Sequence, residues 1–139
     1  MALIEFENSP STNTPINADN LNNNFGECYN IIESGSNSNG NYIKFSDGTM
    51  ICYGRQAMTF SSTISYGNIY RGDAQTINLP ATFIDTNYQR FISPLAPIHD
   101  SYSVDNDITT STFKFFPVSY TSQGEDTRYI SYFAIGKWK

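Results

Sequence analysis

The sequence is poor in charged residues and has a single histidine. Asp, Glu, Lys and Arg make up 15 % of its 139 residues, against roughly 25 % in soluble domains generally. A Ser-His-Asp or Cys-His arrangement would need His99, and no nucleophile motif lies beside it. Two cysteines, Cys28 and Cys52, are too few for a disulfide framework and are not clustered with histidine as zinc ligands are. We therefore expect no catalytic residues, no cofactor and no metal.

Basic residues and long apolar runs are scarce as well. Eight Lys and Arg stand against thirteen Asp and Glu, a formal net charge of -5, so the chain lacks the basic surface that binds nucleic acid or an acidic membrane. No apolar run approaches the roughly 20 residues of a transmembrane helix. The first ten residues contain neither the basic nor the apolar region of a secretory signal. We expect the protein to be made and assembled in a cytoplasm.

Aromatic and neutral polar side chains are abundant. Tyr and Phe occur ten times each, and Ser, Thr and Asn take the place of charged residues. Disordered chains lack aromatic residues, whereas β-strands are enriched in them. Rings beside neutral polar groups are also typical of surfaces that bind carbohydrate or protein. The composition therefore favours a folded β protein with a contact surface.

The first 34 residues predict an arm and a short helix. Residues 1–15 begin with alternating apolar positions and continue as a polar stretch with two prolines, which predicts an extended arm, either docked on a neighbouring protein or frayed. Residues 16–34 predict a helix with Asn17 as its N-cap. Its apolar residues have the spacing of a coiled-coil seam and are Ala18, Leu21, Phe25, Cys28 and Ile32.

This helix is weak by itself. It is short, rich in Asn and contains Gly26, which costs up to about 1 kcal/mol relative to Ala. Its apolar stripe must be buried, either against the β-rich part of the same chain or against copies of itself. Residues 35–41 are small and polar and predict a flexible linker. A linker at this point favours the second alternative, a self-associating stem.

The β-rich part, residues 42–139, opens with the strongest local signal in the sequence. Two β-prone runs, 42–46 and 49–53, flank Asp47-Gly48, which predicts a two-residue type I′ hairpin. In that register one face of the hairpin is apolar and consists of Ile43, Phe45, Met50 and Cys52, with Ile43 opposite Cys52 and Phe45 opposite Met50.

The remaining sequence predicts an antiparallel β-sandwich. Further strands are expected at residues 56–61, 75–79, 88–93, 109–120 and 128–137, with a loop at 122–126. Both faces of the last strand are apolar, because Tyr129, Phe133 and Ile135 alternate with Ile130, Tyr132 and Ala134. A sandwich strand needs only one apolar face, so the second face indicates burial against another protomer.

Four short segments are similar to motifs of one family. They are residues 13–22 (NTPINADNLN), 36–54 (SNSNGNYIKFSDGTMICYG), 78–83 (NLPATF) and 132–139 (YFAIGKWK). The last three resemble the start, an internal strand and turn, and the closing strand of bacteriophage tail-fibre C-terminal domains. The first resembles a segment that precedes a helix in phage tail and baseplate proteins. The family often has Trp where this chain has Tyr53, and its binding residues vary, so none is carried over.

The resemblance implies a mainly β protein with an H-type-lectin-like sandwich at residues 42–139. It also implies a homotrimer whose short N-terminal helix forms a trimeric stem, and a place at the tip of a virion fibre.

Carbohydrate binding needs rings for stacking and polar groups for the sugar hydroxyls, and three predicted loops contain both. The candidate residues are Tyr66, Tyr70, Arg71, Asp73, His99, Asp100, Tyr102, Asp105, Asn106, Asp107, Gln123, Glu125 and Asp126. Each of them alone is also an ordinary exposed loop residue. The three aspartates between residues 100 and 107 also suggest a cation loop, but the calcium-loop pattern is incomplete.

Two functions remain open from the sequence. In the first, the chain is a receptor-binding tip that attaches to host-surface carbohydrate. In the second, it completes a tail, baseplate or capsid and recognises nothing outside the virion. Both place it in the virion as a homotrimer whose arm contacts other tail or baseplate proteins. Cleavage of a sugar polymer by two carboxylates is a third and less favoured hypothesis.

Overall fold

The computed structural model describes the backbone of residues 31–95 and 100–139, with side chains described for 31–93 and 107–139. This part of the chain is all β. Its strands are β1 (Ile31–Asn37), β2 (Gly40–Phe45), β3 (Thr49–Ser62), β4 (Ile64–Tyr66), β5 (Ile69–Arg71), β6 (Gln75–Asn78), β7 (Gln89–Leu95), β8 (Asp100–Ile108), β9 (Thr112–Ser119) and β10 (Gln123–Lys137). Within these residues, no helix has the length and apolar character needed to cross a membrane.

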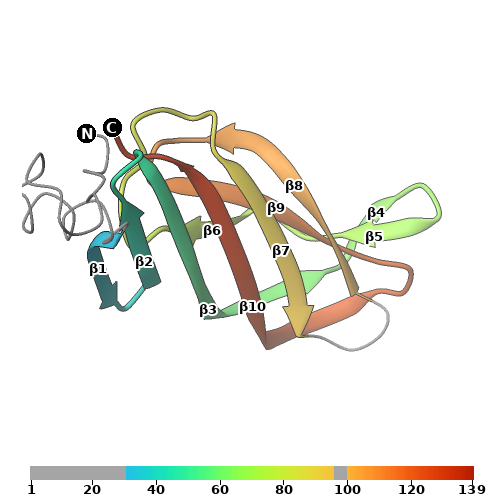
Figure 1. Ribbon diagram of the computed structural model, residues 1–139. Coiled ribbons are helices and arrows are strands. Elements are labelled where there is room, and N and C mark those ends of the chain that lie inside the picture. The colour runs from blue at the N-terminus through green and yellow to red at the C-terminus, as the bar shows by residue number, and fades with distance from the viewer. Residues whose placement is uncertain (1–30, 96–99) are drawn as a thin grey trace, which may run out of the picture.

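The strands form two antiparallel sheets packed as two layers (Figure 1). The first sheet has the order β1-β2-β3-β10-β7, and the second has β4-β5-β9-β6, with β8 on the other side of β9. All strand pairs are antiparallel. The expectation of a mainly β, antiparallel sandwich is therefore confirmed.

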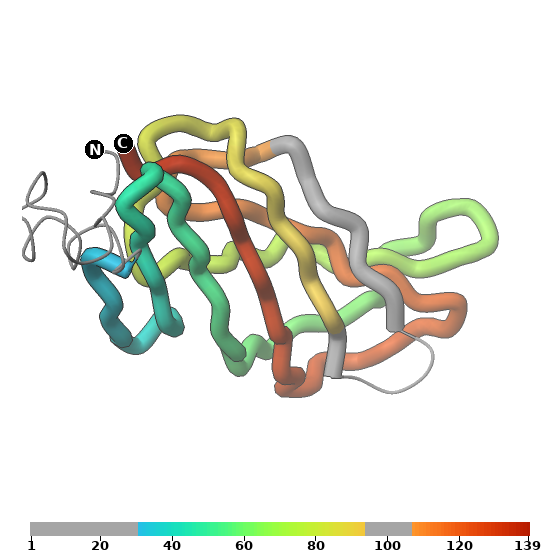
Figure 2. Tube along the Cα trace, viewed as in Figure 1, coloured from blue at the N-terminus to red at the C-terminus, as the bar shows by residue number. Residues whose placement is uncertain are grey.

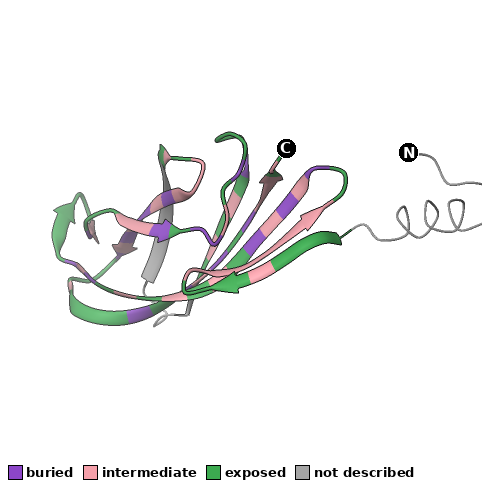
Figure 3. Ribbon diagram, turned by 90° about the vertical axis from the view of Figure 1, so that its left-hand side faces the viewer, coloured by how far each residue is buried: buried purple, intermediate pink, exposed green. Residues whose placement is uncertain are grey.

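The core lies between the two sheets and is held by aromatic contacts that cross the layers. The Phe60 ring meets Phe115 edge-on at 6.1 Å, and the Phe113 ring meets Tyr132 edge-on at 6.3 Å. Edge-to-face packing of this kind adds about 0.5–1.5 kcal/mol per pair beyond area burial. Figure 3 shows buried positions alternating with intermediate ones along parts of the strands, as expected for sheets with one inner face.

The hairpin at Asp47-Gly48 exists, but its predicted register is wrong by one residue. Tyr42 pairs with Cys52 and Lys44 with Met50. Gly48 donates a 3.1 Å backbone hydrogen bond to the Phe45 carbonyl and has φ 90°. The loop is therefore a three-residue turn ending in a left-handed glycine, not a two-residue type I′ turn. Because a shift of one residue exchanges the two faces of a strand, Ile43 lies on the outer face.

The predicted linker at residues 35–41 is instead the hairpin formed by β1 and β2. Its strands pair from Ile31 opposite Phe45 to Asn37 opposite Gly40. The Asn37 side chain donates a 2.9 Å hydrogen bond to the Pro80 carbonyl, and the Asn39 side chain donates one of 3.4 Å to the Leu79 carbonyl. Small polar residues are ordered here because their amides bond the backbone of another loop.

The same hairpin changes the end of the predicted stem. Ile32 was expected on the helical seam but lies in β1, where it is exposed. The last turn of a short, Asn-rich helix competes poorly with a backbone that can pair with β2. Leu21, Phe25, Cys28 and the rest of the predicted arm and stem, residues 1–30, lie outside the described residues.

All three predicted binding loops lie largely in strands, and the first of them, with Tyr66, Tyr70 and Arg71, is the hairpin of β4 and β5. Residues 100–108 form β8 along β9, and residues 123–126 belong to β10, so the turn before β10 lies at residues 120–122. Both segments have irregular pairing, between Val104 and Ile108 in β8 and between Gln123 and Asp126 in β10. Polar sequences of this kind suggest a loop, and here tertiary pairing outweighs that local preference.

Candidate ligand-binding site

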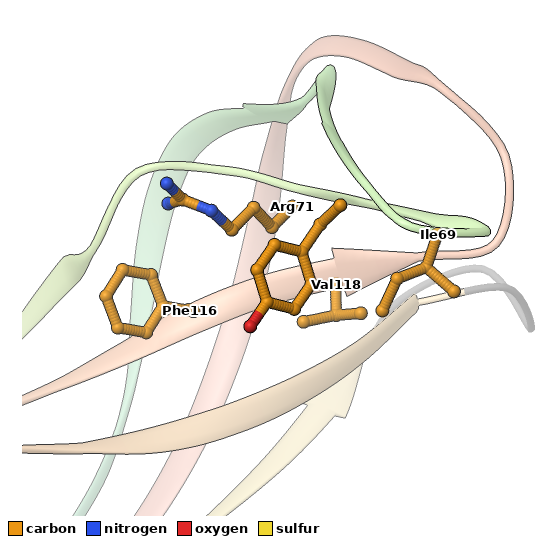
Figure 4. A pocket seen from close by; sticks show the side chains of 5 residues that line it. Ile69, Arg71, Phe116 and Val118 are labelled. Atoms are coloured by element: carbon orange, nitrogen blue, oxygen red, sulfur yellow. The ribbon is translucent and has the colours of Figure 1, made fainter.

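A partly open hollow lies on the outer face of the second sheet. Its volume is about 530 Å³, and it is lined by Tyr66, Ile69, Arg71, Phe116 and Val118. Figure 4 shows the Phe116 and Ile69 side chains at its two ends, with Val118 between them and Arg71 alongside. The hairpin of β4 and β5 and the distant strand β9 therefore contribute to one site.

The alternation of β9 explains why Phe116 and Val118 face outward. Phe113, Phe115 and Pro117 are fully buried between the sheets. Successive side chains of a strand point to opposite faces, so Phe116, between Phe115 and Pro117, and Val118, between Pro117 and the buried Ser119, must face outward. Phe116 and Val118 are only half-buried there, which leaves an apolar surface in contact with solvent.

The short hairpin of β4 and β5 supplies the other wall. Tyr66 pairs with Ile69, and Arg71 pairs with Val118 of β9. Gly67, with φ 65°, provides the left-handed residue of the tight turn between the two strands. This pairing places Tyr66, Ile69 and Arg71 on the same face of the sheet as Val118.

The rings and the guanidinium are accessible. Tyr66 is 65 % exposed. The Arg71 guanidinium lies 5.7 Å from the centre of the Phe116 ring, and among the described residues its one hydrogen bond is a 3.5 Å contact with the Gly72 carbonyl. A guanidinium has five N–H donors, so most of those of Arg71 have no partner among the described residues. The site can therefore stack a flat apolar surface and donate several hydrogen bonds.

The hollow lies far from the end of the sandwich where the described chain begins. In Figures 1 and 2, β4 and β5 project at one end of the sandwich, and β1 and the C-terminus lie at the other. Anything joined through Ile31 is attached at the end opposite the hollow.

Two of the predicted binding residues, Tyr66 and Arg71, meet in this hollow. Tyr70 does not, because it lies between Ile69 and Arg71 in β5 and points to the other face. Asp73 follows β5, and its backbone carbonyl accepts a 3.0 Å hydrogen bond from the Gln75 side chain.

The residues predicted in the second loop do not form a cluster on a loop. Asp100, Tyr102, Asp105, Asn106 and Asp107 all lie in β8. Asp100 and Asp107 are seven residues apart along it, which separates them by about 20 Å. The Asp107 carboxylate forms an ion pair with Lys114 of β9. His99 lies outside the described residues.

The third predicted loop contributes nothing to the hollow. Gln123 and Glu125 lie at the beginning of β10. The Gln123 side chain donates a 2.7 Å hydrogen bond to the Thr121 hydroxyl, and Asp126 accepts one from the Thr127 amide. Within the described ranges, no group of three His, Cys, Asp or Glu side chains is close enough to hold a metal ion.

Sequence reasoning missed Ile69, Phe116 and Val118. The signal for Phe116 and Val118 was the expected strand at 109–120, whose two faces are both apolar at its C-terminal end. Such a strand predicts an outer apolar surface, but only the pairing with β5 shows which residues complete it.

A second apolar surface covers the outer face of the first sheet. Phe133 pairs with Tyr53 on one side and Phe91 on the other, and the Phe91 and Phe133 rings are 6.2 Å apart. These three side chains are 38–59 % exposed. A shallow hollow of about 200 Å³ lies over β7 and β10 at this place. The outer apolar face expected for the last strand is thus present; nothing covers it within the chain's described part.

Comparison with solved structures shows a likeness of fold to phage-like tail fibres. The C-terminal part of the P. aeruginosa R1 pyocin fibre matches 88 % of this chain with 14 % identity and a TM-score of 0.53, and this chain spans 32 % of its length. An N-truncated R1-type pyocin tail fibre matches 88 % of this chain with 14 % identity and a TM-score of 0.51, over 98 % of its own length. No family model and no curated protein matches the sequence. The fold agrees with the resemblance to tail-fibre domains.

Proposed function

We propose that this chain is the receptor-binding tip of a phage-type tail fibre and attaches to carbohydrate on the host surface. One observation carries the proposal: the hollow combines the exposed Tyr66 ring and the half-buried Phe116 ring with a guanidinium that has one weak hydrogen bond among the described residues. The apolar face of a sugar ring stacks on aromatic side chains, and its hydroxyl groups accept hydrogen bonds. The tail-fibre fold of the two pyocin structures supports a place on a virion.

The position of the hollow fits a tip. A stem joined through Ile31 would approach one end of the sandwich and leave the hollow at the other end, facing away from the fibre. The H-type-lectin-like head, the helical stem at residues 16–30 and an arm that contacts other tail or baseplate proteins belong to this proposal.

The same proposal includes a homotrimer. It is supported by the coiled-coil spacing of Leu21, Phe25 and Cys28 and by the exposed row Tyr53, Phe133 and Phe91. Patches of large apolar side chains on a soluble protein usually mark contact sites. Light scattering of the purified full chain should give a mass three times that of one chain, 15.6 kDa; the mass of a single chain would contradict the trimer.

The experiment for the binding proposal compares two variants that each remove one aromatic ring. Labelled full chain is applied to host cells and to their isolated envelope polysaccharide. Phe116→Ala removes a ring from the hollow, and Tyr120→Ala removes an exposed ring beyond the end of β9. We expect Phe116→Ala to lose binding and Tyr120→Ala to keep it. If the unaltered chain binds no envelope fraction, the structural alternative replaces the proposal.

We propose no enzymatic role. The same polysaccharide incubated with the full chain should release no reducing sugar. If the full chain releases reducing sugar and the Phe116→Ala variant does not, this part of the proposal is contradicted.

A further inference from the structure

We infer that the hollow formed by Tyr66, Ile69, Arg71, Phe116 and Val118 selects carbohydrate that carries a negatively charged group, a carboxylate or a phosphate. This inference rests on the proposed carbohydrate binding and names the class of sugar. Nothing in the fold similarity assigns a charge to the ligand.

The first argument is the isolation of the Arg71 charge. Lys44 is paired with Glu33 at 3.0 Å, and Lys114 is paired with Asp107. Arg71 forms no ion pair with any side chain that the structure describes, and its polar contact is the weak bond to the Gly72 carbonyl. None of the acidic side chains that the structure describes neutralises the Arg71 guanidinium, so with respect to these residues its charge is available to a ligand.

The second argument is the chemistry of the wall around that charge. The other four lining residues are Tyr66, Ile69, Phe116 and Val118, none of which carries a charge. A charge pair is stronger where apolar groups displace water and lower the local dielectric. The planar guanidinium can bond two oxygens of a carboxylate or phosphate at once, which a neutral hydroxyl cannot match.

The third argument is the relative position of ring and charge. The guanidinium is 5.7 Å from the Phe116 ring centre. A pyranose ring stacked on Phe116 therefore brings a substituent on its edge within reach of Arg71. Uronic acids and phosphorylated sugars carry their charge on such a substituent.

The test uses bacterial surface polysaccharides of known structure, immobilised in matched pairs. One pair is a uronic-acid polymer and its carboxyl-reduced form, and another is a polymer with phosphate side groups and its dephosphorylated form. Neutral polymers complete the set. Affinities of the full chain are measured with Arg71→Gln, Arg71→Lys and the control Arg55→Gln. Arg55 is an exposed arginine on the other sheet, stacked on Tyr129 at 4.2 Å.

We expect the charged member of one pair to bind about tenfold more tightly, or more, than its uncharged form, the range of a charge-assisted hydrogen bond. Arg71→Gln should abolish that ratio, Arg71→Lys should keep part of it, and Arg55→Gln should leave it unchanged. The pair that responds identifies carboxylate or phosphate as the group.

Other results overturn the inference. A ratio that Arg71→Gln leaves intact, or equal binding of neutral polymers, contradicts it while the proposed function stands. Absence of binding to every polymer contradicts both. If the Arg71→Gln variant does not fold, the affinity of the unaltered chain for the charged polymer is measured at increasing salt concentration. The inference requires this affinity to fall as the salt concentration rises, and an affinity that does not depend on salt overturns it.

Discussion

The Tyr132 hydroxyl donates a 2.5 Å hydrogen bond to the backbone carbonyl of Asn39, which lies 93 residues earlier in the chain. Tyr132 belongs to β10 and its ring lies in the core, where it is 4 % exposed. Asn39 lies in the turn between β1 and β2. The bond therefore fastens the first hairpin to the centre of the sandwich.

Replacing Tyr132 with Phe should lower the free energy of unfolding by about 1 kcal/mol. The loss is modest because the Asn39 carbonyl keeps a second donor, the Gln56 side chain at 2.9 Å. Urea unfolding measures the change. Tyr129→Phe is the matched control in the same strand, since Tyr129 is exposed, and it should leave the midpoint unchanged. Equal midpoints for Tyr132→Phe and Tyr129→Phe would show that the bond contributes nothing.

Gly40→Ala should be more damaging, with a loss of more than about 2 kcal/mol. A Cβ at Gly40 would lie 2.3 Å from the Tyr132 hydroxyl oxygen and 2.6 Å from the Tyr53 carbonyl oxygen, and its φ of 141° is unfavourable for alanine. Gly124→Ala is the control, because a Cβ there meets no atom within 4 Å. Thermal unfolding of both variants checks the prediction, and a Gly40→Ala protein as stable as Gly124→Ala contradicts it.

Phe115 and Phe116 should separate stability from binding. Phe115 is fully buried and packs on Phe60, so Phe115→Ala should cost about 3–5 kcal/mol. Phe116 faces the hollow, so Phe116→Ala should remove binding with a much smaller change in the melting temperature. Calorimetry and polysaccharide binding are measured on both. A Phe116→Ala variant that melts as low as Phe115→Ala would place Phe116 among the core residues.

Alkaline pH should destabilise the protein through Cys52. Burial raises the pKa of the Cys52 thiol from 9.0 to about 11. Between these values the unfolded chain loses the thiol proton and the folded chain keeps it, so stability falls as pH rises through this window. Burial also raises the pKa of Tyr88, to about 12, which extends the decline to higher pH.

Urea unfolding at pH 9 and at pH 11 measures the decline, in a Cys28→Ser background that leaves Cys52 as the remaining thiol. Cys52→Ala should show a smaller decline than its parent. Identical declines in the two proteins would mean that Cys52 does not titrate differently on folding.

Much of the architecture could be predicted from alternation along the chain. The two apolar faces of the last strand indicated both a core face and an outer face, and β10 has Ile130, Tyr132 and Ala134 buried with Tyr129 and Phe133 exposed. The hairpin at Asp47-Gly48 was also predictable. Its register was not, because two- and three-residue loops with glycine share the same local signal.

The errors share a physical cause. Residues 35–41 and 100–107 are polar, and polar stretches without a period suggest loops. In the structure, the pairing of β1 with β2 and of β8 with β9 makes most of both segments strands. The paired strands lie close to each other in sequence. The side-chain hydrogen bonds that hold them to the rest of the protein, such as that of Asn37 with the Pro80 carbonyl, involve loops that are distant in sequence.

Only two of the five residues that line the hollow could be predicted, and Phe116 and Val118 could not, because they depend on pairing between strands that are distant in sequence. Tyr66 and Arg71 lie near each other in sequence and suggest a binding loop by residue type alone. Phe116 and Val118 are 45 or more positions further along, and only the antiparallel pairing of β5 with β9 places them beside Arg71. A pattern within one segment cannot predict which strands become neighbours.

Binding of the full chain to bacterial surface polysaccharide tests the central claim most directly. The chain and its Phe116→Ala variant are applied at equal concentration to a printed set of defined polysaccharides. We predict that the chain binds at least one polymer and that Phe116→Ala, while still folded, loses that signal. Absence of binding to every polymer, or binding that Phe116→Ala leaves unchanged, would contradict the account.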